Sequence, residues 1–377
     1  MSPPLDEALL DDEARLGAAD ARGTLRALAT AGAQVRTGVR CAREAGIGRV
    51  AGGERPRSVL VASLAGSAVV ADVLELLAGP GSPVPVWVRR NVPLPGWVGA
   101  LDLVIAVSES GRAAGPLALA AEAARRGAWL LTVGAPDSPL ADICARAQGV
   151  HVEVARTSVS ARTALWALLT PVLVASDVLG LASVDEAVLA RVADRLDAVA
   201  EAARPSSEAF VNPAKSLALD LAGGVPAVLG DGPLAGVAAA RTAAMLARTS
   251  RVPATWGELA DGADQIVACF DGPFAGRSDP FADPFLDPVT APSLRLVLMR
   301  DQLPGTALAD AVEQTARESA VAVSTLHAEP GHPVERLADL IALTDYASTY
   351  LALAQGFDPT VSAHVADLRD HTDRGLR

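Results

Sequence analysis

Aromatic side chains are scarce in this sequence. Phe, Trp and Tyr together make up 3% of its 377 residues, although half of the residues are hydrophobic. A core with so few rings has to be filled by Ala, Val and Leu, a composition that suits buried parallel strands covered by Ala-rich helices. The scarcity therefore favours an α/β protein, and the length predicts two domains that can each bury a core.

Positive charge is also in short supply. The formal net charge is -12, the sequence pI is about 4.9, and Lys215 is the only lysine. A negative surface repels the phosphate backbone of nucleic acids, so nucleic acid is excluded as an expected partner. Any phosphate group has to be held by local donors, such as the backbone N–H groups at the start of a helix.

Signals for secretion, membrane insertion and disulfides are missing. The three cysteines match neither a paired disulfide framework nor a metal-ligand spacing, which indicates reduced thiols. The acidic N-terminus lacks a basic segment followed by an apolar run. The longest apolar stretch, residues 164–182, is interrupted by Pro171 and Asp177 and is interpreted as a buried helix. We expect a cytoplasmic protein with no membrane partner.

Short apolar strands alternate with helices twice along the chain. Strands are expected at residues 58–62, 84–88, 101–107, 128–133 and 150–154, and again at 225–229, 265–270, 294–298 and 320–324. The expected parts are N-terminal covering helices (1–55), a first lobe with two bridging helices at 161–179 and 184–203 (56–204), and a second lobe with C-terminal helices (205–377). Residues 277–292, rich in Asp-Pro pairs, are expected to be irregular. Each lobe is predicted to be a mostly parallel sheet flanked by helices, with the two lobes related by a pseudo-twofold axis.

Two loops in the first lobe combine glycine with hydroxyl groups. Gly66 and Ser67 lie between a strand and a helix, and Ser108, Ser110 and Gly111 lie at the next such junction. Hydroxyl and N–H groups at a helix start can bind an oxyanion. Ser and Gly at these junctions are also common in ordinary capping and turn structure, and each loop alone leaves that alternative open.

An ordered series of residues from about position 55 to the end resembles the SIS (sugar isomerase) domains of bifunctional phosphoglucose/phosphomannose isomerases. In chain order the matching positions are Gly66, Ser67, Arg89, 93–95, Ser108, Ser110, Gly111, Arg162, 212–215, Ala240, Arg241, Asp345, Ser348, 350–352 and 358–360. The resemblance implies two SIS-type lobes, a homodimer, no cofactor, no metal and a phosphorylated hexose or related small molecule as ligand.

The resemblance also implies the residues that bind the substrate phosphate. They are Gly66, Ser67, Ser108, Ser110 and Gly111, and Arg112, which is new in this chain, is added to them as a candidate. The family has threonines where this chain has Ala113 and Pro116, so two hydroxyl donors are lost. The guanidinium of Arg112 can replace them with two parallel N–H bonds, or it is simply an exposed loop arginine. Arg162 and Arg369 stand where the family has cations near its active site, and they imply that an anionic ligand is still recognised.

The catalytic positions depart furthest from the family. Isomerisation needs a base that moves a proton between carbons and a group that opens the sugar ring. The positions of the family's Glu and His fall at Arg248 and Asp264. A guanidinium cannot act as a base, because its pKa lies above about 12. Acids and histidines elsewhere remain alternatives, although such residues are usually solvated: Glu258, Asp261, His327 and His332.

Two functions follow from this pattern. The first is a sugar-phosphate-binding SIS protein that has lost the catalytic Glu and His and acts as a binder, sensor or partner in hexose-phosphate metabolism. The alternative is an active phosphoglucose/phosphomannose isomerase whose acid and base have moved. A third class, an SIS transcription regulator, would need a DNA-binding helical unit, and the acidic N-terminus offers none.

Overall fold

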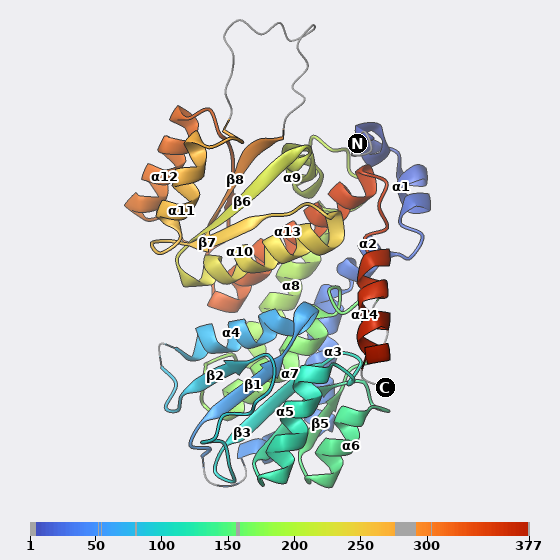
Figure 1. The fold of residues 1–377 in the computed structure, drawn as a ribbon, viewed down its shortest axis with the longest axis vertical. Helices are drawn as coiled ribbons and strands as arrows, with labels where there is room; N and C mark the ends of the chain where they lie inside the picture. Colours follow the sequence, from blue (N-terminus) through green and yellow to red (C-terminus); the bar gives the residue numbers. More distant parts are fainter. Residues whose placement is uncertain are drawn as a thin grey trace, which may run out of the picture. The chain divides into compact units, whose positions relative to one another are not determined.

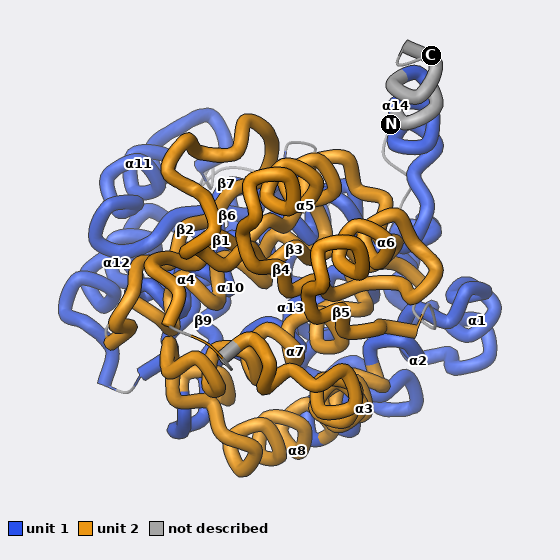
Figure 2. Tube along the Cα trace, turned by 90° about the horizontal axis from the view of Figure 1, so that it is seen from below, with its two compact units in different colours: residues 1–28, 198–332, 336–377 blue, residues 29–197, 333–335 orange. Residues whose placement is uncertain are grey.

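The computed structural model describes residues 5–51, 53, 55–79, 81–155, 159–275, 292–302 and 304–375. By its internal contacts the chain forms two compact units (Figures 1 and 2). Unit 1 contains residues 1–28, 198–332 and 336–377, and unit 2 contains residues 29–197 and 333–335. Helix α8 (Glu186–Ala202) carries the chain from unit 2 into unit 1. The predicted irregular segment at 277–292 lies almost wholly outside the described residues.

Unit 2 is built on a five-stranded parallel sheet with the strand order β2-β1-β3-β4-β5. The strands are β1 (Val59–Ser63), β2 (Val86–Arg89), β3 (Leu103–Ser108), β4 (Trp129–Gly134) and β5 (Val150–Glu153). β1 and β3 are buried along their whole length, as expected where helices cover both faces of a sheet. All five strands lie within two residues of their predicted positions.

Helices cover both faces of this sheet (Figure 1). Helices α5 (Ala114–Arg125) and α6 (Pro139–Arg146) pack on one face through a core of Leu, Val and Ala side chains. Helices α4 (Ala68–Ala78) and α7 (Leu165–Val178) contact the strands and each other on the other face. The small side chains allow close helix–sheet packing, which is the arrangement that the scarcity of aromatics predicted.

Helix α7 is enclosed inside unit 2. It packs along α3 (Ala31–Glu44), whose Gly38 lies so close that an added Cβ would be 2.8 Å from the Cβ of Thr170. Pro171 is tolerated inside the helix, and the Thr170 hydroxyl donates to the Trp166 carbonyl at 2.7 Å. The long apolar run of residues 164–182 is therefore explained by the burial of α7 within unit 2.

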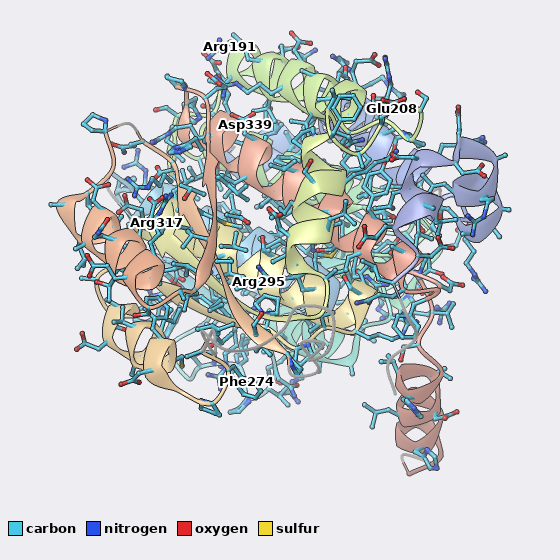
Figure 3. The ribbon with its side chains drawn as sticks, turned by 90° about the horizontal axis from the view of Figure 1, so that it is seen from above. Arg191, Glu208, Phe274, Arg295, Arg317 and Asp339 are labelled. Atoms are coloured by element: carbon cyan, nitrogen blue, oxygen red, sulfur yellow. The ribbon has the colours of Figure 1, made fainter. Side chains whose placement is uncertain are left out.

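Unit 1 repeats the pattern with a four-stranded parallel sheet of order β7-β6-β8-β9. Its strands are β6 (Gly224–Asp231), β7 (Thr255–Glu258), β8 (Ser293–Arg300) and β9 (Ala322–His327). Helix α12 (Ala307–Glu318) packs on one face, with polar side chains such as Arg317 pointing outward (Figure 3). Helices α9 (Pro213–Leu221) and α10 (Pro233–Met245) contact the sheet as well. The predicted two-lobed α/β fold is confirmed.

One predicted strand in unit 1 is wrong. Residues 265–270 belong to helix α11 (Ala263–Val267) and the 3-10 turn η5 (Ala268–Asp271). Ala263, Ile266 and Phe270 are buried against the sheet, and the residues between them are mostly exposed. This spacing of three and four residues is the helical period, which a short apolar run does not distinguish from a strand. The true edge strand is β7, which begins ten residues earlier than the predicted strand.

The N-terminal segment is held to unit 1 by the only lysine. The segment forms η1 (Glu7–Asp11), α1 (Glu13–Ala19) and α2 (Thr24–Ala29). The Lys215 ammonium is buried and donates to the carbonyls of Leu10, Pro205 and Ser207, and it lies 5.5 Å from the ring centroid of Tyr350. Burial lowers the pKa of Lys215. Three carbonyls and a ring face satisfy the ammonium without a carboxylate partner within hydrogen-bond distance among the described residues.

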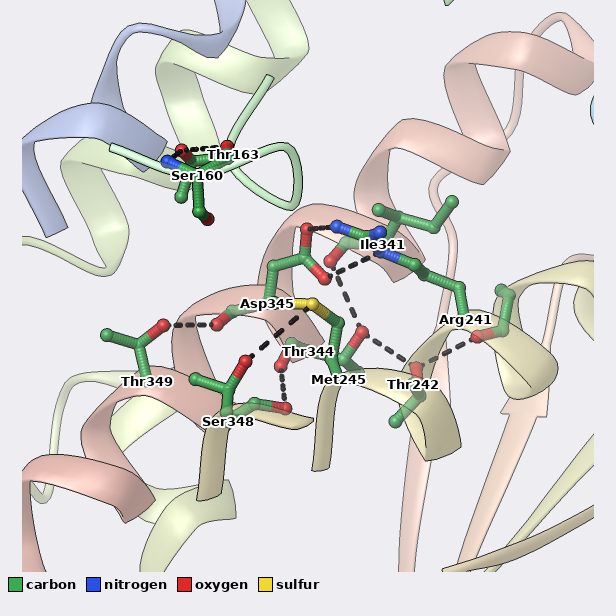
Figure 4. A network of polar contacts seen from close by, with 12 residues as sticks. Ser160, Thr163, Arg241, Thr242, Met245, Ile341, Thr344, Asp345, Ser348 and Thr349 are labelled. Atoms are coloured by element: carbon green, nitrogen blue, oxygen red, sulfur yellow. Dashed lines mark hydrogen bonds and ion pairs between the residues drawn. The ribbon is translucent and has the colours of Figure 1, made fainter. Parts of the chain in front are cut away.

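Two long C-terminal helices complete unit 1. In α13 (Pro333–Ala354), Asp345 forms a buried ion pair with Arg241 of α10, with N–O distances of 3.2 and 2.9 Å (Figure 4). The hydroxyls of Thr242 and Thr344 bond to each other at 2.8 Å beside this pair. Helix α14 (Ala363–Gly375) ends the described chain. Among the described residues, no helix is long and apolar enough to cross a membrane.

Candidate functional site

The first predicted phosphate loop follows strand β1 and forms a closed turn. Ala65 adopts a left-handed backbone conformation with φ of 57°, and residues Ala65–Ser67 form the 3-10 turn η3. The backbone N–H and the hydroxyl of Ser67 both donate to the carbonyl of Leu64, at 3.3 and 3.0 Å. Ser67 is buried and stands directly before helix α4. The loop therefore has a defined conformation without a ligand, and it places the Ser67 hydroxyl at the start of helix α4.

The second predicted phosphate loop follows strand β3 and is held by its own serines. The Ser108 carbonyl accepts from the Gly111 N–H at 2.9 Å, and its hydroxyl accepts from the Ala113 N–H at 3.3 Å. The Ser110 hydroxyl accepts from the Arg112 N–H at 3.3 Å. These three bonds to serine oxygens fix the conformation of the loop directly before helix α5.

Gly111 is required for this turn. Its φ is +62°, and an added Cβ would lie 2.1 Å from the Ser138 hydroxyl oxygen. Ser138 caps helix α6 by accepting from the Ala141 N–H at 3.2 Å, and its own hydroxyl donates to the Ala135 carbonyl at 2.7 Å. The sequence analysis did not single out Ser138, although its position before Pro139 is typical of a helix cap.

The fold brings the two loops together. β1 and β3 are adjacent parallel strands, with Ser63 paired to Val107, so both loops leave the same edge of the sheet. Gly66 lies against the segment that carries Arg162, because an added Cβ would be 3.3 Å from the Ala161 Cβ and 3.6 Å from the Arg162 backbone nitrogen. Gly66, Ser67, Ser108, Ser110, Gly111 and Arg162 are thus gathered at one carboxyl edge, which is where open α/β sheets bind ligands.

The start of helix α5 faces this edge without a capping side chain of its own. Its N-cap residue is Ala113, whose side chain has no oxygen to accept a hydrogen bond from the first backbone N–H groups of the helix. The first N–H groups of a helix lack intrahelical partners and carry the positive end of the helix dipole. Arg112 is exposed beside them and half-buried Arg162 lies near Gly66. The arrangement can hold an anion through N–H groups, hydroxyls and a guanidinium.

Unit 2 is also the electrically neutral part of the chain. It contains 16 acidic and 16 basic residues, whereas unit 1 contains 28 acidic and 16 basic residues and carries the whole net charge of -12. An anionic ligand is therefore repelled far less by unit 2 than the net charge of the protein suggests.

The family's catalytic positions lie in unit 1. Arg248 is half-buried in a π-helical turn (Leu246–Ser250) at the end of α10, and Asp264 is exposed in the first turn of α11. Among the alternatives, Asp261 and His327 are exposed as the sequence analysis expected for solvated side chains. Arg369 lies in α14, but its side chain is outside the described part of the chain.

The other two alternatives, Glu258 and His332, are half-buried. Glu258 ends the edge strand β7, and His332 stands directly before helix α13. Within the described ranges, no group of three or more His, Cys, Asp or Glu side chains could hold a metal ion.

Comparisons with known proteins agree with this architecture. Residues 210–371 match the family model of the bacterial phosphoglucose isomerase C-terminal SIS domain. A comparison with curated protein sequences gives no match. A hypothetical protein from Thermus thermophilus superposes with a TM-score of 0.72 at 15% identity, covering 98% of this chain and 95% of that one.

Two further solved structures share the fold. The C-terminal domain of glucosamine-fructose-6-phosphate aminotransferase from Francisella tularensis has a TM-score of 0.60 at 14% identity, over 90% of this chain and 98% of that one. A glucose-6-phosphate isomerase like protein, also from Thermus thermophilus, has a TM-score of 0.51 at 18% identity, over 85% and 88%. The predicted resemblance is confirmed at the level of the fold and of one domain: the chain has the fold of these SIS-type structures, and residues 210–371 match the model of the bacterial phosphoglucose isomerase C-terminal SIS domain.

Proposed function

We propose that the protein binds a phosphorylated hexose, or a closely related sugar phosphate, at the carboxyl edge of the unit 2 sheet. In this proposal Gly66, Ser67, Ser108, Ser110 and Gly111 form the phosphate cradle, and Arg112 and Arg162 supply positive charge. The protein acts as a binder, sensor or partner in hexose-phosphate metabolism, without the acid and base of the isomerases that it resembles.

The observation that supports this proposal best is the convergence of two preformed loops at one sheet edge. Ser67 and Ser110 follow the adjacent strands β1 and β3 and so lie at the same edge of the sheet. Helix α5 begins shortly after Ser110 and has no side-chain cap. A phosphate there would accept from N–H groups that otherwise have no intrahelical partner. Neutral unit 2 permits this binding even though the chain as a whole is acidic.

The direct test is calorimetric titration of the purified protein with glucose 6-phosphate, mannose 6-phosphate and fructose 6-phosphate, with interconversion assayed in parallel. We expect binding of at least one sugar phosphate and no binding of the unphosphorylated sugars. The double variant Ser67→Ala/Ser110→Ala should abolish binding and lower the thermal midpoint without ligand by only a few degrees, because hydroxyl bonds in such loops contribute about 1 kcal/mol each. Ser319→Ala, at the end of α12 in unit 1, is the matched control.

Two outcomes would contradict the proposal. If the double variant bound normally, the phosphate would be held elsewhere. If the wild type interconverted the sugar phosphates at an ordinary enzymatic rate, the chain would be an active isomerase whose acid and base have moved, and Glu258 and His332 would be the first residues to substitute.

We further propose a cytoplasmic homodimer, following the family resemblance and the free cysteines Cys41, Cys144 and Cys269. Helix α7, the most apolar helix of unit 2, is covered inside that unit by α3 and α4. A dimer must therefore use another surface. Light scattering at micromolar concentration tests the proposal, and a monomer would contradict it.

A further inference from the structure

The two sheets can be superimposed residue by residue through their pairing registers. The edge strands β2 and β7 each have four residues, and their first residues pair with Val59 of β1 and Ala227 of β6. Counting along the central strands from these anchors, Ser63 of unit 2 corresponds to Asp231 of unit 1. The same anchors pair with Leu103 and Leu296, so Ser108 corresponds to Asp301.

The carboxyl edges of the two sheets therefore differ in chemistry. Where unit 2 has the buried hydroxyls of Ser63 and Ser108, unit 1 has two buried carboxylates, Asp231 and Asp301, each 7% exposed. Burial raises the pKa of Asp301, and the nearby charge of Asp231 raises it further, against the opposing effect of Arg336. Asp301 is paired with Arg336 at 2.7 Å, so Asp231 is the carboxylate that would repel a phosphate group at this edge.

Asp231 is bonded to the residue that begins helix α12. It accepts from the Thr306 backbone N–H at 2.9 Å and from the Thr306 hydroxyl at 2.6 Å. Thr306 is the N-cap residue of α12, and α12 follows β8 as α5 follows β3. The start of the helix that corresponds to α5 thus already holds an anion from its own chain.

The surrounding space is filled by the chain itself. Arg300, 6% exposed, donates to Asp310 at 2.6 Å and to Glu313 at 2.8 Å. An added Cβ at Gly305 would lie 2.6 Å from the nearest Arg300 nitrogen and 3.0 Å from an Asp231 oxygen. The loop between β8 and α12 is therefore packed directly onto Arg300 and Asp231.

We infer that unit 1 carries a built-in anion, the Asp231 carboxylate, in place of a ligand, so that the chain binds one sugar phosphate and binds it in unit 2. This inference rests on the proposed function for the identity of the ligand. The two similar lobes then differ in function. Unit 2 binds the anionic ligand, and Asp231 prevents an anion from binding at the corresponding edge of unit 1. The concentration of the net negative charge in unit 1 agrees with this division.

The stoichiometry of glucose 6-phosphate binding tests the inference. Calorimetric titration should give one site per chain in the wild type and none in Ser67→Ala/Ser110→Ala. Two sites per chain, or one site that survives the double substitution, would overturn the inference while leaving sugar-phosphate binding intact. An absence of binding by all three hexose phosphates would instead overturn the proposed function.

A second measurement tests the role of Asp231 without any ligand. Asp231→Ser introduces the residue found at the corresponding position of unit 2, and Thr306→Val removes the acceptor's hydroxyl partner. Each should lower the thermal midpoint by several degrees. Thr306→Val also removes the N-cap bond from the Ala309 N–H, at 3.2 Å. The double variant should still lose clearly less than the sum of the two shifts, because the bond between Asp231 and the Thr306 hydroxyl is lost in both single variants. Additive shifts, or an unchanged midpoint for Asp231→Ser, would show that the carboxylate does not stabilise the start of α12.

Discussion

Arg241 and Asp345, two of the positions that match the resembled family, form an ion pair that stabilises the fold. Both side chains are at most 6% exposed, and the two N–O contacts join α10 to α13 inside unit 1. Removing one partner leaves a buried charge without its counter-ion, which typically costs about 3 to 5 kcal/mol. We predict that Arg241→Met lowers the free energy of unfolding by this amount in chemical denaturation.

The matched control for this prediction replaces both charges. Arg241→Met/Asp345→Leu removes the pair without leaving a charge behind, so it should be more stable than Arg241→Met alone. A double variant that is less stable than the single variant would mean that the pair contributes net stability beyond charge compensation.

His151 on the edge strand β5 should make unit 2 sensitive to acid. Its Nδ1 lies 2.7 Å from the Thr132 hydroxyl, and its Nε2 is buried without a hydrogen-bond partner among the described residues. Burial lowers the pKa of His151 below its ordinary value of 6.5. The unfolded chain therefore binds a proton at a higher pH than the folded chain does, and stability falls as the pH drops below about 6.5.

We predict that the thermal midpoint of the wild type falls between pH 7 and pH 5, and that His151→Gln reduces this fall. Gln keeps a polar side chain opposite Thr132 but has no titratable group in this range. The midpoint of both proteins is measured across the pH series. If the two profiles ran parallel, another group would be responsible for the acid sensitivity.

At the scale of elements, the loop between β3 and α5 depends on one glycine. Gly111 combines a φ of +62° with a clash that any Cβ would make with Ser138, 2.1 Å away. We predict that Gly111→Ala distorts the loop, destabilises unit 2 by about 1 to 3 kcal/mol and weakens sugar-phosphate binding at least tenfold. Calorimetric titration and thermal unfolding measure the two effects.

Gly17 provides the control for this substitution. It lies in helix α1, has no positive φ, and an added Cβ would meet nothing within 4 Å. Gly17→Ala should therefore raise stability by up to about 1 kcal/mol and leave binding unchanged. Equal binding losses in both variants would show that the effect of Gly111→Ala is not local.

Helices and strands were predictable from the sequence where the local pattern of apolar residues matches their burial in the fold. Long buried strands such as β1 and β3 have an unbroken apolar run, and their positions were predicted closely. The edge strand β7 was missed because Thr255–Glu258 contains one large apolar residue and a glycine, so its place in the sheet comes from pairing with β6. The π-helical turn at Leu246–Ser250 has no sequence signature at all.

At the scale of the whole molecule, the sequence predicted two similar lobes and the two loops of the candidate site. It did not show that the lobes differ at their carboxyl edges, because Asp231 and Asp301 are ordinary acids until strand pairing shows that they correspond to Ser63 and Ser108. It also did not show the unequal charge of the two units, since unit 1 is assembled from three separate segments. Both features depend on contacts between residues far apart in the chain.

Turnover needs both a bound sugar phosphate and working acid and base groups, and the resemblance places those groups at Arg248 and Asp264. A guanidinium, such as that of Arg248, cannot serve as a general base, and Asp264 is an exposed carboxylate in the first turn of a helix. A positioned base alone typically contributes about 10² to 10⁴ in rate. We therefore predict that the wild type binds sugar phosphates but interconverts them at close to the background rate.

The variant Arg248→Glu/Asp264→His restores the family's residue types at both positions and should raise the isomerisation rate above that of the wild type without changing affinity much. Arg248→Gln/Asp264→Asn is the matched control, because it changes the same positions without supplying a base. A wild-type kcat of about 1 to 10³ per second, the range of ordinary enzymes, would contradict the prediction. A rise in rate with the control variant would mean that the Arg248 charge, rather than the missing base, limits the reaction.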